Sequence, residues 1–228
     1  KFAGKLFSRT GDDISKSFPD LAEHFQFDAV LDGELLIKRE GRVQDSNTLQ
    51  QRLNRKAVTP KLQAEFPPFI RVYDLLACGD EDLRQLAFAE RRSRLEEFVR
   101  DHPFAPIDLS PMIPFKTWDE LTYARANPAD TDVKADAEAV EGVMIKRHDS
   151  PYLAGRPKGH WFKWKRDPMV IDAVLMYAQR GSGKRSSFYS DYTFGVWKDD
   201  ELTPVGKAYF GFTDQELMEL DKFVRNNT

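Results

Sequence analysis

Short apolar segments of strand length recur along the chain, and their order limits the folds that it can adopt. They lie at residues 27–37, 69–76, 142–146, 161–165, 169–178 and 189–197. Segments of this length that are rich in β-branched and aromatic residues are typical of strands. Residues 82–101 instead carry apolar side chains at helical spacing, with charged residues on the other face. The sequence therefore predicts a chain of mixed α and β structure.

Two further segments predict strands of lower regularity. Residues 4–9 (GKLFSR) have the pattern of a strand that is already in progress. Residues 107–115 contain two prolines, which a central strand does not accept, so an edge strand or an irregular segment is predicted there. Asp32-Gly33 joins two apolar runs and favours a tight turn or a bulge inside β structure.

Three further segments are predicted to be helical. Residues 46–56 form a short polar candidate, and residues 118–140 are rich in alanine on either side of Asn127-Pro128. Near the end of the chain, Thr213 precedes Glu216 by three residues, which is the spacing of a capping box. A last helix is therefore predicted over residues 213–224.

The composition changes at Pro168, and a domain boundary is predicted near Asp167. The chain has 228 residues, enough for one large domain or for one domain and a smaller second one. The second piece would hold about 60 residues, which is short for an independent barrel.

Composition excludes several classes of protein. With 34 Lys and Arg against 37 Asp and Glu, the net charge of −3 argues against a polycationic nucleic-acid coat. No segment has the roughly 20 apolar residues of a membrane span, and the first residues lack a signal-peptide pattern, so we expect a soluble intracellular protein. One cysteine excludes an intrachain disulfide, and four histidines without ligand spacing make a zinc site improbable.

Positive charge is concentrated in residues 146–166. Within this segment Lys163 and Lys165 alternate with Phe162 and Trp164, so both ammonium groups are expected on one face of a strand. Such a pair favours an anion between its members, and a phosphate is the natural candidate. A solvated strand face explains the same pattern equally well. The seven basic residues of the segment are Lys146, Arg147, Arg156, Lys158, Lys163, Lys165 and Arg166, against one acid, Asp149.

Two carboxylates stand at the edges of apolar strands. Glu34 lies between Gly33 and Leu35, and Glu141 immediately precedes an apolar strand. If both converge on the lysine pair, hard oxygen ligands for Mg²⁺ would lie beside phosphate-binding cations, which is the equipment of phosphoryl transfer. In the alternative interpretation each carboxylate simply pairs with a nearby Arg or Lys.

Five segments, taken together, resemble the ATP-dependent DNA ligases of the covalent nucleotidyltransferase superfamily. They occur in the family's order and at reasonable spacing, and the resemblance covers nearly the whole chain. Each is short and weak alone, but five in order make coincidence improbable. The segments are 6–11 (LFSRTG), 32–34 (DGE), 70–74 (IRVYD), 141–146 (EGVMIK) and 161–165 (WFKWK).

The resemblance implies an α+β fold in two parts. Residues 1–167 would form a nucleotidyltransferase, or adenylation, domain of antiparallel sheets with flanking helices. Residues 168–228 would form part of an OB-fold β-barrel, a fold that commonly presents basic and aromatic residues to nucleic acid.

The resemblance also implies a role for particular side chains. Arg9 and Glu34 would hold the ribose and a neighbouring phosphate, and Tyr73 would stack on adenine. Lys163 and Lys165 would neutralise the α-phosphate as charge builds on it, and these two with Glu141 are the candidate catalytic residues. Lys146 would join the nucleotide site, and Glu34 and Glu141 would hold the metal. The candidate DNA-binding residues are Arg156, Lys158, Arg180, Lys184 and Arg185.

The activity implied by the resemblance is nick sealing in three steps. A lysine attacks ATP to form lysyl-AMP, AMP passes to a 5′-phosphate at a nick, and the 3′-hydroxyl displaces AMP. ATP and Mg²⁺ are the implied cofactors, nicked double-stranded DNA is the implied partner, and we expect a monomer in a bacterial cytoplasm. RNA ligases and mRNA capping guanylyltransferases share these motifs, and a nick-binding or nucleotide-binding module without catalysis is a third interpretation.

The sequence departs from the family pattern at both ends. The Lys-x-Asp-Gly motif with the nucleophile is expected before Arg9, but in Lys1-Phe2-Ala3-Gly4 an alanine stands where the acid should be. The final basic motif of the OB domain is also missing. From these departures we expect no AMP adduct when this chain is incubated with ATP and Mg²⁺.

Overall fold

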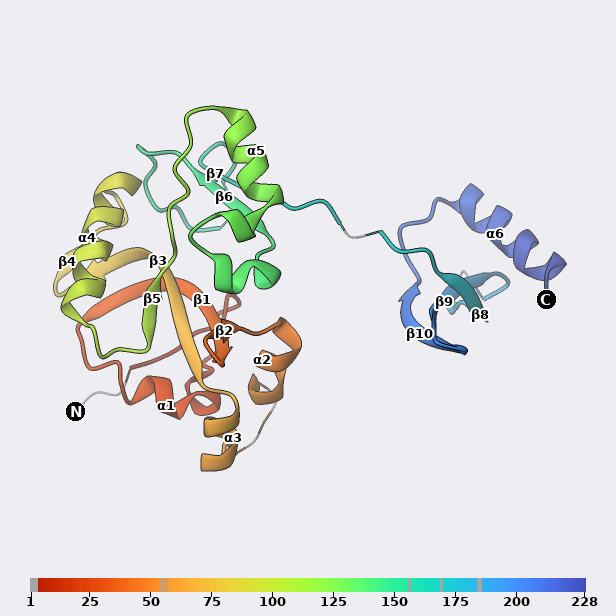
Figure 1. The fold of residues 1–228 in the computed structure, drawn as a ribbon, viewed down its shortest axis with the longest axis horizontal. Coiled ribbons are helices and arrows are strands. Elements are labelled where there is room, and N and C mark those ends of the chain that lie inside the picture. The colour runs from red at the N-terminus through yellow and green to blue at the C-terminus, as the bar shows by residue number, and fades with distance from the viewer. Residues whose placement is uncertain (1–3, 54, 56, 156, 169, 184–185) are drawn as a thin grey trace. The chain divides into compact units, whose positions relative to one another are not determined.

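The computed structural model describes the chain in two compact units, Lys1–Asp167 and Pro168–Thr228 (Figure 1). The described residues are 4–53, 55, 57–155, 157–168, 170–183 and 186–228. No helix among them is both long and apolar enough to cross a membrane. The α+β class that the sequence predicts is confirmed, since sheets and helices are mixed in the first unit and follow one another in the second.

The first unit is organised around two long antiparallel strands, β1 (Ala29–Arg39) and β3 (Pro68–Cys78). Two-residue strands, β2 (Arg42–Val43) and β4 (Glu81–Asp82), extend this sheet at its sides. β5 (Ile107–Leu109) pairs with β3 in the parallel sense, whereas the other strand pairs in the described part of the chain are antiparallel as expected. A parallel neighbour needs a crossover, which helix α4 (Phe88–Asp101) provides.

A bulge interrupts β1 where Asp32-Gly33 predicted a turn or bulge. The pairing of β1 with β3 shifts register between Asp32 and Gly33. A Cβ atom at Gly33 would lie 2.5 Å from a methyl group of Ile70 and 2.9 Å from the carbonyl oxygen of Arg71. Glycine therefore allows the two strands to approach closely here, beside the carboxylates of Asp32 and Glu34.

The apolar core of the first unit consists of two clusters of buried residues that pack against this sheet. One cluster packs around Phe18 and Leu21 beside the short helix α1 (Pro19–Ala22), and the other packs around Val72 and Leu95, where α4 covers β3. Near the first cluster, buried Arg52 of helix α2 (Ser46–Leu53) donates to both carboxylate oxygens of Asp20. The second cluster holds the two long strands against α4. The other helices of this region are α3 (Pro60–Glu65) and the short 3-10 helix η1 (Ser15–Ser17).

A separate two-stranded hairpin carries the basic segment. It consists of β6 (Gly142–Lys146) and β7 (Trp161–Lys165), which pair with each other in an antiparallel register. Three helices precede the hairpin in the sequence. They are α5 (Trp118–Ala126) and then the short 3-10 helices η2 (Pro128–Asp130) and η3 (Lys134–Ala139). Figure 1 shows α5 beside this hairpin. The alanine-rich segment is thus helical on both sides of Asn127, as predicted, but as 3-10 turns on the second side.

The second unit contains a three-stranded antiparallel sheet in its described part, in the order β10-β9-β8. Its strands are β8 (Val174–Arg180), β9 (Tyr189–Lys198) and β10 (Glu201–Ala208). Helix α6 (Asp214–Asn226) begins with the predicted capping box, in which Thr213 and Glu216 exchange hydrogen bonds. Asp221 of this helix accepts a hydrogen bond from the backbone of Tyr189, so α6 is fastened to β9.

Three of the predicted elements differ from the structure, and one of them is the strand expected over 169–178, which begins only at Val174. Residues 4–9 do not form a strand, because in this segment only Phe7 makes a β-bridge, with Asp13. The helix predicted over 82–101 begins six residues later, at Phe88. Leu83, immediately after β4, is buried in the core and therefore fits the apolar spacing of the helix. It lies outside the helix, so the pattern predicted a helix start that is too early.

A buried ion pair joins β3 to α4, and its loss should destabilise the fold. Asp74 and Arg91 are both 0% exposed, and Arg91 donates to each carboxylate oxygen, at 2.7 and 3.0 Å. Replacing Asp74 with alanine leaves Arg91 as an unpaired buried cation. We expect Asp74→Ala to lower the free energy of unfolding by about 3–5 kcal/mol, measured by urea denaturation.

The exposed pair between Arg84 and Asp82 supplies the control. Arg84→Ala should leave the denaturation midpoint unchanged, because an exposed pair contributes little. If Asp74→Ala and Arg84→Ala lower the free energy of unfolding equally, burial does not make the Asp74–Arg91 pair more important for stability than an exposed pair.

Candidate functional site

One face of the β6–β7 hairpin carries three lysines. Met144 is paired with Lys163, Lys146 with Trp161, and Gly142 with Lys165. Because paired residues of an antiparallel ladder point to the same face, Lys146, Lys163 and Lys165 lie on one side. The sequence predicted this common face for Lys163 and Lys165 from their alternation with aromatic residues.

The Glu141 carboxylate contacts both exposed lysines. One of its oxygens lies 3.3 Å from the Lys165 amine and 3.7 Å from the Lys163 amine. A hydrogen bond and the charge of Lys165, with the charge of Lys163 in addition, lower the pKa of Glu141 below its ordinary value. All three side chains are about 60% exposed, so the cluster is open to a ligand from solvent. Its geometry leaves the lysines free to exchange Glu141 for a phosphate.

Glu34 lies close enough to this cluster to sense its charges. Desolvation by the surrounding protein raises the pKa of Glu34, although its side chain is exposed at the sheet surface. The charge of Lys163 opposes this rise, and the charges of Glu141 and Asp32 reinforce it. The structure therefore brings Glu34, Glu141 and Lys163 into one neighbourhood, although they come from three separate segments.

Tyr73 stands beside Glu34 and is fixed by its hydroxyl group. That hydroxyl donates to one oxygen of Asp32 at 2.8 Å, and the hydroxyl of Tyr152 donates to the other at 2.7 Å. Burial, followed by the charge of Asp32, raises the pKa of Tyr73 far above its ordinary value. Both phenols therefore stay protonated and continue to donate, and the ring of Tyr73 is held in one orientation.

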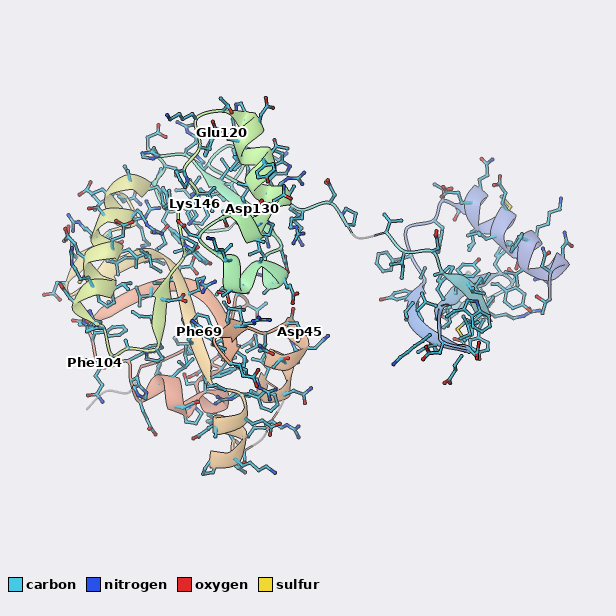
Figure 2. The ribbon with its side chains drawn as sticks, viewed as in Figure 1. Asp45, Phe69, Phe104, Glu120, Asp130 and Lys146 are labelled. Carbon is cyan, nitrogen blue, oxygen red and sulfur yellow. The ribbon has the colours of Figure 1, made fainter. Side chains whose placement is uncertain are left out.

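The Lys146 side chain, labelled in Figure 2, is only 8% exposed, whereas the side chains of Lys163 and Lys165 on the same strand face are about 60% exposed. Its amine is surrounded by aromatic rings, with ring centroids at 3.8 Å for Trp161, 4.5 Å for Tyr73 and 4.8 Å for Phe88. It makes no hydrogen bond with any described residue, and the nearest carboxylate oxygen, of Asp74, is 3.9 Å away. Burial lowers the pKa of Lys146 to about 8. The amine thus covers one face of the Tyr73 ring.

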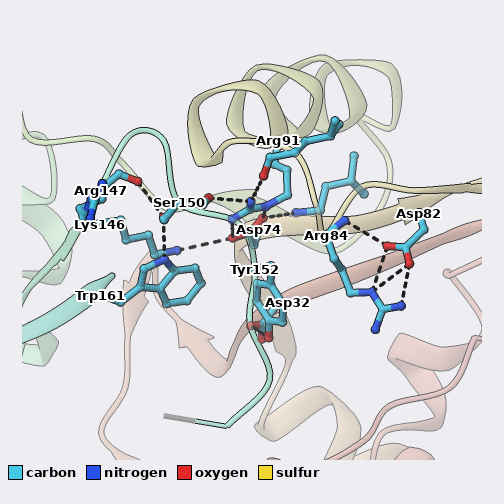
Figure 3. A network of polar contacts seen from close by, with 12 residues as sticks. Asp32, Asp74, Asp82, Arg84, Arg91, Lys146, Arg147, Ser150, Tyr152 and Trp161 are labelled. Carbon is cyan, nitrogen blue, oxygen red and sulfur yellow. Dashed lines mark hydrogen bonds and ion pairs between the residues drawn. The ribbon is translucent and has the colours of Figure 1, made fainter. Parts of the chain in front are cut away.

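The buried Asp74–Arg91 pair extends into this arrangement, as Figure 3 shows. Besides binding Asp74, Arg91 donates to the carbonyl oxygen of Ser150, in the segment that follows β6. The hydroxyl of Ser150 is in turn within 3.4 Å of the indole nitrogen of Trp161. This chain of contacts connects the main sheet, α4 and the hairpin, and thereby sets where Tyr152 and Lys146 lie.

The donor set suits a magnesium ion that is shared with a phosphate. No group of three or more His, Cys, Asp or Glu side chains that could hold a metal ion occurs in the described part of the chain. Mg²⁺ is usually bound through one or two carboxylates together with substrate phosphates and water. Glu34 and Glu141 supply two such carboxylates in the neighbourhood of Lys163, so the residues fit this mode of binding.

The other predicted site residues lie apart from this cluster or outside the described residues. Arg9 is exposed in a turn and makes no hydrogen bond or ion pair with any described residue, so its contact with a nucleotide stays a prediction. Lys158 is exposed between β6 and β7. In the second unit the guanidinium of Arg180 lies 5.7 Å from the ring centroid of Tyr189. The remaining candidates, Arg156, Lys184 and Arg185, fall outside the described residues.

Several residues that shape the site were not found from the sequence. Asp32 was read only as part of a turn, yet its carboxylate fixes the phenols of Tyr73 and Tyr152. Asp74 directly follows Tyr73 in the same apolar run, and a charged residue inside a buried strand is the signal that could have indicated its ion pair. Nothing in the spacing of Tyr152 indicated its role.

A family model for the "ATP dependent DNA ligase domain" matches residues 3–165. This match covers well over half of the chain and includes every residue of the cluster described above. The chain belongs to this ligase domain family.

Named ligases match almost the whole chain. The "Probable DNA ligase" of Koribacter versatilis is 37% identical over 98% of this chain, which corresponds to 42% of that protein. "DNA ligase 1" of Korarchaeum cryptofilum is 32% identical over 93% of this chain and 38% of its own length. The chain thus spans less than half the length of these relatives.

Solved structures of ligases share the fold. The ligase domain of M. tuberculosis LigD has a TM-score of 0.52 at 24% identity, covering 96% of this chain and 64% of that chain. A Lig E DNA ligase has a TM-score of 0.63 at 17% identity, covering 94% and 74%. At these identities the likeness concerns the fold alone.

The buried amine of Lys146 predicts a distinctive pH dependence in this ligase domain. The folded-state pKa of about 8 lies below the ordinary value of 10.5, so the unfolded chain holds more protons between these pH values. Stability should therefore rise with pH across this window, relative to a variant without the amine. Urea denaturation of the unaltered chain and of Lys146→Met should show that the difference between their free energies of unfolding grows by at most about 3–4 kcal/mol, at about 1.4 kcal/mol for each pKa unit.

Lys61→Met, which removes an exposed lysine from α3, is the matched control and should show no such trend. A pH-independent difference between the unaltered chain and Lys146→Met would contradict the buried position of this amine.

Proposed function

We propose that this chain carries the nucleotide-binding and nick-binding core of an ATP-dependent DNA ligase. The observation that supports it most is the placement of Lys163 and Lys165 on one strand face, both within 4 Å of Glu141. An exposed lysine pair that is bridged by one carboxylate is suited to binding a phosphate that passes between two acceptors. Family membership gives this arrangement its reaction class.

The adenosine part of the nucleotide would bind at Tyr73. Lys146 covers one face of its ring, so adenine would stack on the opposite face, and the hydroxyl is already bound to Asp32. Because that hydroxyl and the cation fix the ring beforehand, little rotamer freedom is lost when a base stacks on it. Glu34 would accept a hydrogen bond from the ribose, and Arg9 would approach the neighbouring phosphate.

The reaction assigned to the lysine pair is displacement of AMP, with its α-phosphate, from the adenylated 5′-phosphate of a nick. In the sealing step the 3′-hydroxyl oxygen forms a bond to the 5′-phosphate of the nick, the anhydride bond to AMP breaks, and the hydroxyl proton is released. Lys163 and Lys165 would neutralise the negative charge that builds on the phosphate oxygens and on the departing AMP. Glu141 would orient both amines before the substrate arrives.

Glu34 and Glu141 are the residues that would hold a magnesium ion. Bound there, the ion would polarise the phosphate oxygens and neutralise part of their charge. Because the pKa of Glu34 is raised, protons compete with a cation for this carboxylate at a higher pH than they would at an ordinary glutamate.

The proposed macromolecular partner is nicked duplex DNA. Exposed Lys158 and Arg180 belong to its proposed contacts, because cations that neutralise backbone phosphates supply most of the sequence-independent affinity for DNA. We propose that the protein acts as a monomer in a bacterial cytoplasm.

A nick that already carries the 5′-adenylate tests the site directly, because sealing it does not require a lysyl-AMP. With Mg²⁺ in excess, we expect the chain to seal this substrate slowly in a single-turnover gel assay. Lys163→Ala and Glu141→Ala should each lower the rate by about 100-fold or more, the usual effect of removing a group that stabilises transition-state charge.

Lys61→Ala is the control, since it removes an exposed lysine of the same unit that makes no described contact. Sealing at an unchanged rate in both site variants would refute the assignment of the site. Failure of the unaltered chain to seal would refute the proposed function, and preferential sealing of an adenylated RNA nick would favour an RNA ligase.

A further inference from the structure

Arg125 in the last turn of α5 reaches across to the end of strand β7. Its side chain is 9% exposed. It is one of the buried arginines of the first unit that no predicted role accounts for. A buried guanidinium is costly unless its charge and its donors are matched, so its partners indicate what it holds in place.

The partners of Arg125 are residues at the end of β7 and immediately after it. One terminal nitrogen donates to the carbonyl oxygen of Lys165 at 2.5 Å and to the Asp167 carboxylate at 3.2 Å. The second terminal nitrogen lies 3.4 Å from the other carboxylate oxygen of Asp167. The guanidinium also lies 4.7 Å from the ring centroid of Trp164. One side chain thus contacts three of four consecutive residues.

The carbonyl of Lys165 lies at the free edge of the hairpin. β7 pairs with β6, and on that side the backbone N–H of Arg166 donates to the carbonyl oxygen of Glu141 at 2.8 Å. The carbonyl of Lys165 points the other way, where no strand pairs with β7 in the described part of the chain. Arg125 supplies the donor that a neighbouring strand would otherwise provide.

The position of this carbonyl determines where the Lys165 amine can reach. Lys165 is the last residue of β7, and its amine lies 3.3 Å from Glu141 while the next residue's N–H is bonded to the backbone of Glu141. A strand end frays when its outer edge is unpaired. A frayed end would separate Lys165 from Glu141 and leave only Lys163 in place.

From these contacts we propose that Arg125 is a positioning residue that fixes Lys165 opposite Glu141. Its carbonyl bond holds the Lys165 backbone, its stacking on Trp164 holds the preceding residue, and Asp167 balances its charge. Arg125 touches no reacting atom in this arrangement. The catalytic consequence rests on the proposed function, whereas the structural consequence at the strand end does not.

Amide hydrogen exchange tests the structural part without any ligase activity. In Arg125→Ala we expect the N–H of Arg166, which is bonded to Glu141, to exchange at least about 10-fold faster than in the unaltered chain. Arg125→Lys keeps the charge but lacks the planar fork, so its exchange rate should lie in between. Asp167→Asn, which keeps the bond to the Lys165 carbonyl, should show a smaller effect than Arg125→Ala.

The matched control is Arg100→Ala. Arg100 is also in the last turn of its helix, α4, but it is exposed and makes no hydrogen bond or ion pair with the described residues. Its removal should leave the exchange of Arg166 unchanged. Thermal unfolding of each variant shows whether it is folded at the temperature at which hydrogen exchange is measured.

Single-turnover sealing of a pre-adenylated nick tests the catalytic part. We expect Arg125→Ala to seal about 10- to 100-fold more slowly, with nick affinity within twofold of the unaltered chain and partial recovery in Arg125→Lys. Unchanged exchange at Arg166 would overturn the proposal, and so would faster exchange with unchanged sealing. If the unaltered chain seals nothing, the proposed function fails, while the exchange rates still decide whether Arg125 fixes the strand end.

Discussion

The ion pair between Asp74 and Arg91 is the contact on which the arrangement of the site depends. Both side chains are fully buried, and the guanidinium binds β3, α4 and the carbonyl of Ser150 together. In the described part of the chain the β6–β7 hairpin is not hydrogen-bonded into the main sheet, so it is held there by side-chain contacts of this kind together with backbone hydrogen bonds, such as that from the Tyr152 N–H to the carbonyl oxygen of Arg84. Breaking them would leave buried charges unpaired, which makes alternative placements of the hairpin costly.

Around this pair the lysines divide into two kinds with different physical roles. Lys146 is buried among aromatic rings and has a pKa lowered to about 8, so it belongs to the support of Tyr73. Lys163 and Lys165 are exposed and are kept near Glu141 by weak, solvent-screened contacts. The buried Lys146 therefore supports the site, whereas the exposed Lys163 and Lys165 can rearrange when a phosphate binds.

The sequence predicted the parts of this site that follow from local periodicity. Alternation in β7 placed Lys163 and Lys165 on one face, and Asp32-Gly33 indicated the bulge beside Glu34. It could not predict contacts between distant segments, such as Tyr152 with Asp32, because nothing in the local pattern records them. The strand predicted at residues 4–9 was wrong because apolar Leu6 packs into the core around Phe18 without a strand to pair with.

The central claim is that side chains from β1, β3, β6 and β7 form one nucleotide site. It is tested most directly by titrating the isotope-labelled chain with ATP and Mg²⁺ and following backbone and side-chain NMR signals. We predict that signals of Glu34, Tyr73, Glu141 and Lys163 shift together and fit a single dissociation constant. Shifts confined to one of these strands, or separate constants for the sheet and the hairpin, would contradict the account.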